Sequence, residues 1–337
     1  MRSVLNLYYQ TYSIKKMGIP KLNSYLIKHC SKHSIDKKHL SIFTGKTIVI
    51  DTSIYLYKFA ETNCIVESLY HMICTFAHYN IKPIFIFDGK PPDEKKELIN
   101  KRNDMKIVAG TKQNAAEMEY KILSEVVTKS SEDYDKLDAL KILINNLKKQ
   151  GVRVSRSDAD EARRLLTICK VEYYNAEGEA DELCVNMVLS KKAWACMSDD
   201  MDMLVHGCTR VMRGFSLHSH TVTFYNINGI LRDLDLNMTE FRRIVVISGT
   251  DYNICHSINV VDVFEQFYVY KKLAADNIEF YDWYSLLKHI QIDNDKLKYI
   301  YNMFSNNSVS IPPKPICIIN KVKTISEFLR PYGFVFV

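Results

Sequence analysis

Residues 47–51 read Thr-Ile-Val-Ile-Asp, a short apolar run that ends in an acid, and residues 84–88 repeat the pattern as Ile-Phe-Ile-Phe-Asp. Short apolar runs of β-branched and aromatic residues are typical of strands buried on both faces of a parallel sheet. Ligands bind such sheets in the crevice beyond the carboxyl ends of the strands. The two runs therefore predict an α/β fold that places Asp51 and Asp88 at one functional edge.

Further apolar runs at residues 171–174 and 193–197 continue this pattern, and helical patterns separate them. Strands that alternate with helices predict a mostly parallel central sheet with helices on both faces. One of these helices is expected to begin near Ser157. After Met203 the chain reads as mainly helical, with a helix over residues 239–248 that ends at Gly249.

No strand is predicted between Lys90 and Gly151. Apolar residues recur there at helical spacing, and Gly151 is a plausible helix end; the clearest series is Leu137, Leu140, Ile144 and Leu147. We expect a helical insertion between two strands of the sheet. Taken by itself, the insertion is more simply explained as a packing hairpin than as a functional element.

Acids also follow the other predicted strands, in residues 177–182 (Glu-Gly-Glu-Ala-Asp-Glu) and in residues 199–202 (Asp-Asp-Met-Asp), and one more acid, Asp251, lies in residues 249–252 (Gly-Thr-Asp-Tyr). Each alone could cap a helix or face its dipole, but capping does not account for five such sites. Carboxylates that converge repel one another and need cations to stay ionised, and their oxygens select Mg²⁺ or Mn²⁺. Two such ions about 4 Å apart can drive phosphodiester hydrolysis.

The overall composition fits a folded enzyme. The chain has 337 residues, 47% of them apolar and 25% charged, and a net charge of +6 that is compatible with a nucleic-acid partner. Its nine cysteines form no Cys-x-x-Cys pair and are expected to be reduced. No glycine-rich nucleotide-binding motif, signal peptide or membrane-spanning run is present. We expect an intracellular protein, in the nucleus or the cytoplasm, that acts as a monomer.

Six segments resemble, in order and spacing, the flap endonuclease and XPG-like family of structure-specific 5′ nucleases over roughly residues 17–255. They are residues 17–22, 49–53, 87–92, 176–181, 199–202 and 249–252. The resemblance implies a PIN-like nuclease fold and a metal-binding role for seven acids: Asp51, Asp88, Glu179, Asp181, Asp200, Asp202 and Asp251. Glu177 stands where the family usually has proline and is not assigned this role.

The resemblance also gives roles to residues around the acids. Lys95 and Arg102 match the family's two cations that hold the scissile phosphate, although their pattern alone suggests a solvated charged helix. Tyr57 matches an aromatic residue that stacks on a terminal base, although a core role would explain it equally well. Gly18 matches the family's amino-terminal glycine, which lies close to the active site and binds substrate.

The resemblance also divides the chain. The expected parts are an amino-terminal extension (1–16), nuclease regions (17–110 and 151–255), a helical arch (111–150) and a divergent helical DNA-binding region (256–337). Because an extension would crowd the glycine, translation is expected to start at Met17. The arch of the family admits a 5′ single strand, and Lys106, Lys112 and Lys121 could contact its phosphates.

The resemblance weakens after Asp251. The family has a Gly-Ile-Gly-Pro element there, which grips duplex DNA beside a potassium ion, whereas residues 255–262 contain neither glycine nor proline. Glycine permits close backbone approach, so the potassium site and the duplex grip are in doubt. No sliding-clamp-binding motif is present near the end of the sequence.

The leading hypothesis is a structure-specific 5′ nuclease with two Mg²⁺ ions, replaceable by Mn²⁺, that cuts DNA with 5′ flaps or single-strand/double-strand junctions during replication, recombination or repair. One alternative is a non-catalytic binder of branched nucleic acid. The complete set of acids, together with Lys95 and Arg102, argues against it. A second alternative is a 5′ ribonuclease of related fold.

Overall fold

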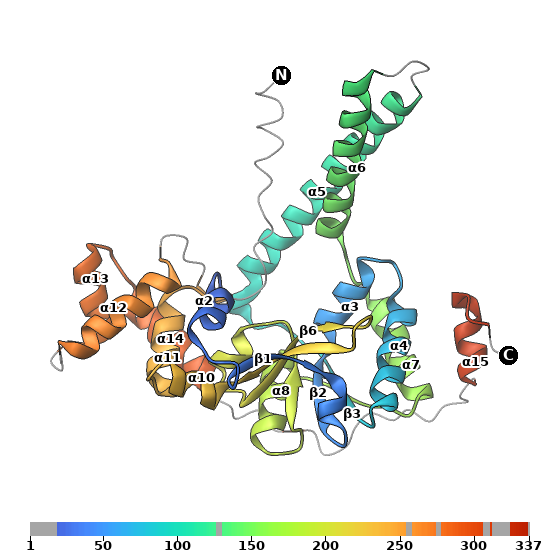
Figure 1. The fold of residues 1–337 in the computed structure, drawn as a ribbon. Coiled ribbons are helices and arrows are strands. Elements are labelled where there is room, and N and C mark those ends of the chain that lie inside the picture. Colours follow the sequence, from blue (N-terminus) through green and yellow to red (C-terminus); the bar gives the residue numbers. More distant parts are fainter. Residues whose placement is uncertain are drawn as a thin grey trace.

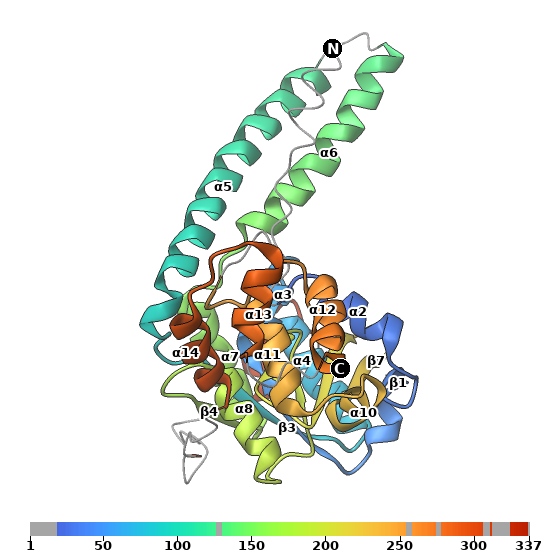
Figure 2. The same ribbon diagram turned by 90° about the vertical axis from the view of Figure 1, so that its left-hand side faces the viewer.

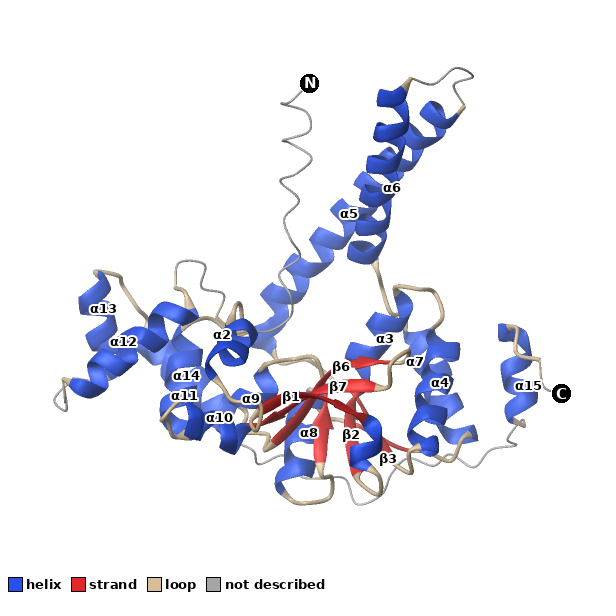
Figure 3. Cartoon of the chain, in the orientation of Figure 1, coloured by secondary structure: helices blue, strands red, loops and turns tan. Residues whose placement is uncertain are grey.

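A computed structural model describes residues 19–125, 130–253, 258–273, 278–305, 311 and 324–335. Its centre is a seven-stranded sheet of order β1-β7-β6-β5-β2-β3-β4 (Figures 1 and 3). The four strands expected from the sequence are present and parallel: β2 (Thr47–Asp51), β3 (Lys82–Phe87), β4 (Glu172–Asn175) and β5 (Ala195–Met197). The predicted α/β fold is therefore confirmed. Residues 1–16 and Gly18 lie outside the described residues.

Three further strands were missed by the sequence analysis: β1 (Ile35–His39), β6 (Arg210–Ser216) and β7 (Thr221–Asn226). β6 lies parallel to β5, then pairs antiparallel with β7, which pairs antiparallel with β1. The expectation of mainly helix after Met203 was wrong for this hairpin. Its strands are only partly buried and lack a continuous apolar run, although the β-branched and aromatic residues of Thr221–Asn226 were a usable signal.

Each face of the sheet has its own hydrophobic core. In β2, Val49 belongs to one core and its neighbours Ile48 and Ile50 to the other, because successive strand residues point to opposite faces. The first core contains residues of α2 (Leu22–His29), α8 (Ala180–Leu189), α9 (Asp202–Val205), α10 (Ile227–Asp233) and α11 (Met238–Ile247). The second contains residues of α3 (Thr52–Ala60), α4 (Ile65–His78) and α7 (Arg156–Ile168). The functional edge therefore lies between two helical layers.

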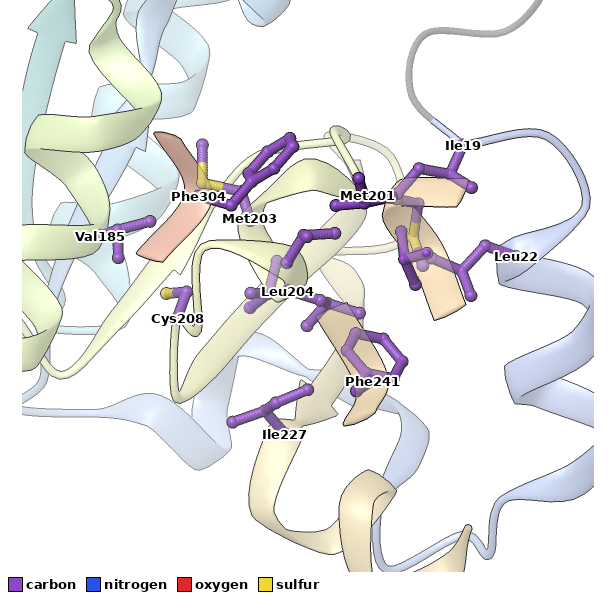
Figure 4. Close-up of a cluster of buried hydrophobic side chains, with 14 of the residues drawn as sticks. Ile19, Leu22, Val185, Met201, Met203, Leu204, Cys208, Ile227, Phe241 and Phe304 are labelled. Atoms are coloured by element: carbon purple, nitrogen blue, oxygen red, sulfur yellow. The ribbon is translucent and has the colours of Figure 1, made fainter. Parts of the chain in front are cut away.

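Figure 4 shows part of the first core. Ile19 and Leu22 from the start of the described chain lie near Met201, and Phe241 and Phe304 come from helices far along the sequence. Because Met201 stands between two of the candidate metal-binding acids, this packing fixes the acidic loop to the body of the protein.

The insertion is helical, as predicted. A 3₁₀ turn (Asp93–Lys95) leads into α5 (Lys96–Ser124), and α6 (Ser131–Gly151) returns antiparallel to it. The two helices form a hairpin that projects from the body (Figures 1 and 2). α6 ends at Gly151, as expected, and the next helix, α7, begins at Arg156, one residue before the predicted Ser157, with Ser155 as its cap.

Beyond the sheet the chain is helical. α11 ends with Ser248 as its cap, directly before Gly249. Beside α11 lie α12 (Val260–Lys272) and α14 (Asn294–Ser305), α13 (Phe280–Lys288) packs on α12, and α15 (Ile325–Leu329) packs on α7. Residues 254–257, the first part of the divergent segment, are outside the described residues. None of the helices in the described ranges is long and apolar enough to cross a membrane.

Candidate active site

The candidate metal-binding acids gather at the carboxyl edge of the parallel strands. Asp51 ends β2, Asp88 follows β3, and Glu179 and Asp181 begin α8 after β4. Asp200 and Asp202 follow β5, and Asp251 follows α11. The structure therefore brings all seven acids that the sequence singled out to one region, although they span residues 51–251.

The turn after β3 is joined to the segment before α8. An Asp88 side-chain oxygen accepts a hydrogen bond from the Ala180 amide at 2.8 Å, so it caps the start of α8. The Gly89 amide donates to the Gly178 carbonyl at 2.7 Å. A Cβ atom at Gly89 would lie 2.2 Å from a backbone oxygen of the same segment, so only glycine fits. This contact holds Asp88 beside Glu179, while Glu177 is exposed.

The acids after β5 are linked to β2 through Ser198, which the sequence analysis did not single out. Its hydroxyl donates to Asp51 at 3.1 Å and accepts from the Asp200 amide at 3.2 Å. An Asp200 side-chain oxygen in turn accepts from the Asp202 amide at 3.0 Å. In the sequence, this linking role of Ser198 was indicated locally only by its position between the end of a strand and an acidic run.

Burial and mutual repulsion raise the pKa values of the acids. Burial, reinforced by Asp88, Asp181 and Asp200, raises the pKa of Asp51 well above its usual range. Burial, with Asp251 and Asp181, raises the pKa of Asp200 to about 6. The pKa of Asp202 rises for the same reasons. Acids from separate segments are thus close enough to feel one another's charge.

The chemistry of this cluster fits a hard cation. Asp202 is 1% exposed, and neither of its carboxylate oxygens has a hydrogen-bond partner among the described residues. A buried carboxylate without a partner is costly unless a cation neutralises it. In the described ranges, no group of three acids, histidines or cysteines already stands in an arrangement that would hold a metal ion. A protein cation, Lys95, lies among the acids instead.

Lys95 is buried, and its ammonium group lies 2.7 Å from a Glu179 oxygen and 4.6 Å from the centre of the Tyr252 ring. The other Glu179 oxygen accepts a hydrogen bond from the Tyr252 hydroxyl at 2.7 Å. Burial would lower the pKa of Lys95, but Asp181 and Glu179 outweigh it and keep the pKa above its usual value. Arg102 pairs with Asp251 at 2.9 Å. Both predicted cations therefore contact the acids directly, and Tyr252 is a further contact residue.

Tyr57 lies on α3, where the hairpin leaves the body, and the Lys106 ammonium stands 4.6 Å from its ring centre. Lys112 and Lys121 are exposed higher on α5. Gly18 cannot be placed because it lies outside the described residues. Tyr57, the aromatic residue expected near the site, therefore lies beside Lys106 of α5.

Two family models match this chain. The XPG N-terminal domain matches residues 17–109, and the XPG I-region matches residues 170–251. Together they cover just over half of the chain and include the seven acids. The unmatched segment between them contains most of the α5–α6 hairpin.

The chain is 28% identical to flap endonuclease 1 of Entamoeba dispar over 302 residues, which cover 84% of this chain and 72% of that protein. It is 27% identical to flap endonuclease 1-B of Oryza sativa subsp. indica, covering 72% of this chain but only 58% of the rice protein. Among solved structures, the catalytic core of Rad2 in complex with a DNA substrate superimposes with a TM-score of 0.63, at 17% identity, over 93% of this chain and 95% of that one.

Proposed function

This chain belongs to the XPG-like flap endonuclease family, and we propose that it is a structure-specific 5′ nuclease that hydrolyses DNA at flaps or branched junctions by two-metal-ion catalysis. The observation that carries the proposal is the gathering of seven acids with Lys95 and Arg102 at one edge of the sheet. The proposal includes 5′ to 3′ exonuclease action on free DNA ends.

We infer that the reaction depends on divalent metal ions, because the acids offer the oxygen ligands that Mg²⁺ prefers, with Mn²⁺ as a substitute. The residues that would hold two ions are Asp51, Asp88, Glu179, Asp181, Asp200, Asp202 and Asp251. The bound ions would supply an activated water and neutralise charge on the leaving oxygen. The unpartnered oxygens of Asp202 support this fit.

Lys95 and Arg102 would bind the scissile phosphate. Each is already close to an acid of the cluster, at 2.7 Å and 2.9 Å, so a phosphate bound to them would lie next to the acids. Charge-assisted contacts of this kind are short and strong, and they fix the orientation of the phosphate before it reacts. Tyr57 would stack on a base beside it, with Gly18 nearby.

The helical region after α11 would hold the duplex, in a form that differs from the family's usual glycine-rich element. We propose that the protein acts as a monomer, in the nucleus or the cytoplasm, during DNA replication, recombination or repair. The described cysteines are all free thiols, in keeping with a reducing compartment.

The test is cleavage of a 5′-labelled DNA flap in Mg²⁺ by the wild type, by Asp200→Asn and by Asp199→Asn. Asp199 is the matched control: it precedes Asp200, but its side chain accepts from the Gly214 amide at 2.6 Å. We expect cleavage near the junction that is lost with Asp200→Asn and retained with Asp199→Asn. Tight binding without cleavage by the wild type would favour the non-catalytic binder, and faster cleavage of a matched RNA flap would favour the ribonuclease.

A further inference from the structure

The ring of Phe304, near the end of α14, is fully buried in the first core (Figure 4). It packs edge-to-face against two other rings, with its centre 4.7 Å from that of His206 and 5.5 Å from that of Tyr252. No role proposed above uses Phe304 or His206. Both neighbours of Phe304 lead to acids of the active site, so α14 is joined to the site through the core.

One of the two contacts leads to Glu179. The Tyr252 hydroxyl donates to one Glu179 oxygen at 2.7 Å, and the Lys95 ammonium lies 2.7 Å from the other. Burial, together with Glu179 and Asp181, raises the pKa of Tyr252, so its hydroxyl stays protonated and remains a donor. A hydrogen bond has a narrow range of length and angle. The place of the Tyr252 ring, which packs on Phe304, therefore sets the orientation of the Glu179 carboxylate.

The second contact leads to Asp181. His206 is 1% exposed, and its Nε2 lies 3.9 Å from an Asp181 oxygen. The backbone of His206 is fixed as well, because Arg242 of α11 donates to its carbonyl oxygen at 3.2 Å. The imidazole ring is therefore held between its own anchored backbone, the ring of Phe304 and the carboxylate of Asp181. In a close-packed interior, a shift of the Phe304 ring would change the distance between His206 and Asp181.

The two acids are two residues apart at the start of α8, and each is contacted by one of the two rings that pack on Phe304. Side chains that orient a metal ligand matter for metal affinity, because a carboxylate that is free to rotate must be ordered when the ion binds. A smaller side chain at position 304 would leave a cavity, and the rings of His206 and Tyr252 would gain freedom. Glu179 and Asp181 would then lose the contacts that keep their oxygens oriented.

We propose that Phe304 is a positioning residue: through Tyr252 and His206, it holds the two acids of α8 in the orientation that binds a metal ion. This inference rests on the proposed function and deepens it, because it makes α14, in the helical region that would hold the duplex, part of the support of the metal site. A phenylalanine that only fills the core would contribute to stability and not to metal affinity. Measuring both quantities distinguishes the two roles.

The first test measures Mn²⁺ binding to the DNA-free protein by isothermal titration calorimetry, and compares Phe304→Leu with Phe280→Leu. Phe280 is the matched control, because it is also fully buried in the first core, and the aromatic rings that it contacts among the described residues belong to α12 and α13. Both variants should melt at a lower temperature than the wild type. Losing a group that orients a metal ligand costs about 10- to 100-fold in affinity, so we expect binding to weaken by about tenfold in Phe304→Leu alone. Equal Mn²⁺ affinity in the two variants would overturn the proposal.

Tyr252→Phe tests one of the two contacts without emptying the core. It removes only the hydroxyl that donates to Glu179 and keeps a ring against Phe304. We expect Mn²⁺ binding to weaken by about tenfold, the effect of losing one hydrogen bond to a charged group. When Phe304→Leu is added, the combined loss should be smaller than the product of the two single losses, because both changes act on Glu179. Wild-type affinity of Tyr252→Phe, or a combined loss equal to the product, would refute the link from Phe304 to Glu179.

Cleavage of a 5′-labelled flap separates this inference from the proposed function. With Phe304→Leu, the Mg²⁺ concentration for half-maximal single-turnover cleavage should rise by about tenfold, while flap affinity in EDTA stays as in the wild type. A wild type that binds Mn²⁺ more tightly than Phe304→Leu but does not cut would support the positioning role and reject the nuclease. A wild type that cuts, with an unchanged Mg²⁺ requirement in Phe304→Leu, would support the nuclease and reject the positioning role. Absence of Mn²⁺ binding by the wild type would reject both.

Discussion

The lower and upper parts of the α5–α6 hairpin belong to the same two helices but are held by different forces. At the base, Lys95 and Arg102 are bound to acids of the sheet edge, and Lys106 lies over a ring of α3. In the upper part, α5 and α6 mainly contact each other. Ala116, Leu140 and Ile144 form a small apolar cluster of their own.

The geometry of the two parts therefore depends on different contacts. The base is an extension of the active site, and its geometry depends on charges that belong to the body of the protein. The upper part is a local antiparallel pair whose contacts are close in sequence. Substitutions at the base should therefore change the rate of DNA cleavage, and substitutions higher up should change only the stability of the hairpin.

The largest effect should come from Lys95→Ala. Removing a cation that neutralises the reacting phosphate typically costs about a hundred- to a thousandfold in rate, so we expect a loss of that size in single-turnover flap cleavage. Lys101→Ala is the control, because Lys101 is exposed on α5, two turns further along, and its ion pair among the described residues is with Glu97, one turn away. A similar loss in both variants would mean that the base is an ordinary charged surface.

The sequence predicted the gathering of acids because strand ends follow from a local pattern and a parallel sheet aligns them. The sequence was less informative about the side chains that contact the acids. Ser198 gave no motif of its own, and the 2.9 Å pair between Arg102 and Asp251 joins residues 149 positions apart. Pairs of that separation depend on how helices pack, which apolar spacing does not specify.

The two parts of the hairpin illustrate the same limit. The spacing of Leu137, Leu140, Ile144 and Leu147 correctly predicted α6, because all four are buried. Met118 and Ile122 are at helical spacing too, yet they are 68% and 61% exposed. Periodicity identified the helix but not the face that packs, and the short, half-exposed strands β6 and β7 had no strong periodicity.

In the upper hairpin, Leu140→Ala should remove about 2 kcal/mol or more of local stability, since it empties part of a small cluster. We expect amide exchange in the upper halves of α5 and α6 to become faster by about tenfold or more, with flap cleavage close to wild type. Ile142→Ala, at a 63% exposed position of α6, is the control. Loss of cleavage with Leu140→Ala would show that the active site depends on the upper hairpin, contrary to the separation of the two parts in the structure.

The base should also respond to pH in a way that the upper hairpin does not. Without metal, the pKa of Asp200 is raised to about 6 in the folded protein, so the fold loses stability as pH rises from about 4, where Asp200 ionises in the unfolded chain, to about 6. In EDTA, Asp200→Asn should therefore raise the melting temperature at about pH 7.5 by a few degrees, equivalent to about 1–2 kcal/mol, and change it little at about pH 3.

Comparing wild type with Asp200→Asn cancels the titrating groups that do not interact with Asp200. Asp51 and Asp202, whose pKa values Asp200 raises, are relieved in the variant, which adds to the expected stabilisation. Asp199→Asn controls for the loss of a nearby charge. In Mg²⁺ the sign should reverse, because a bound cation stabilises the wild type through Asp200. A melting temperature of Asp200→Asn that follows the wild type at every pH would show that the cluster does not repel itself as the structure indicates.

The smallest effect should come from Lys136→Ala. Lys136 contacts Glu119 across the upper hairpin at 2.7 Å, but the two side chains are 56% and 39% exposed, so water and salt screen the pair. We expect amide exchange in α5 and α6 within about twofold of wild type and unchanged cleavage. If instead this variant opened the hairpin as much as Leu140→Ala does, charge pairing rather than the apolar cluster would hold the upper part together. The contrast with the base would then be one of burial, since both parts would depend on ion pairs.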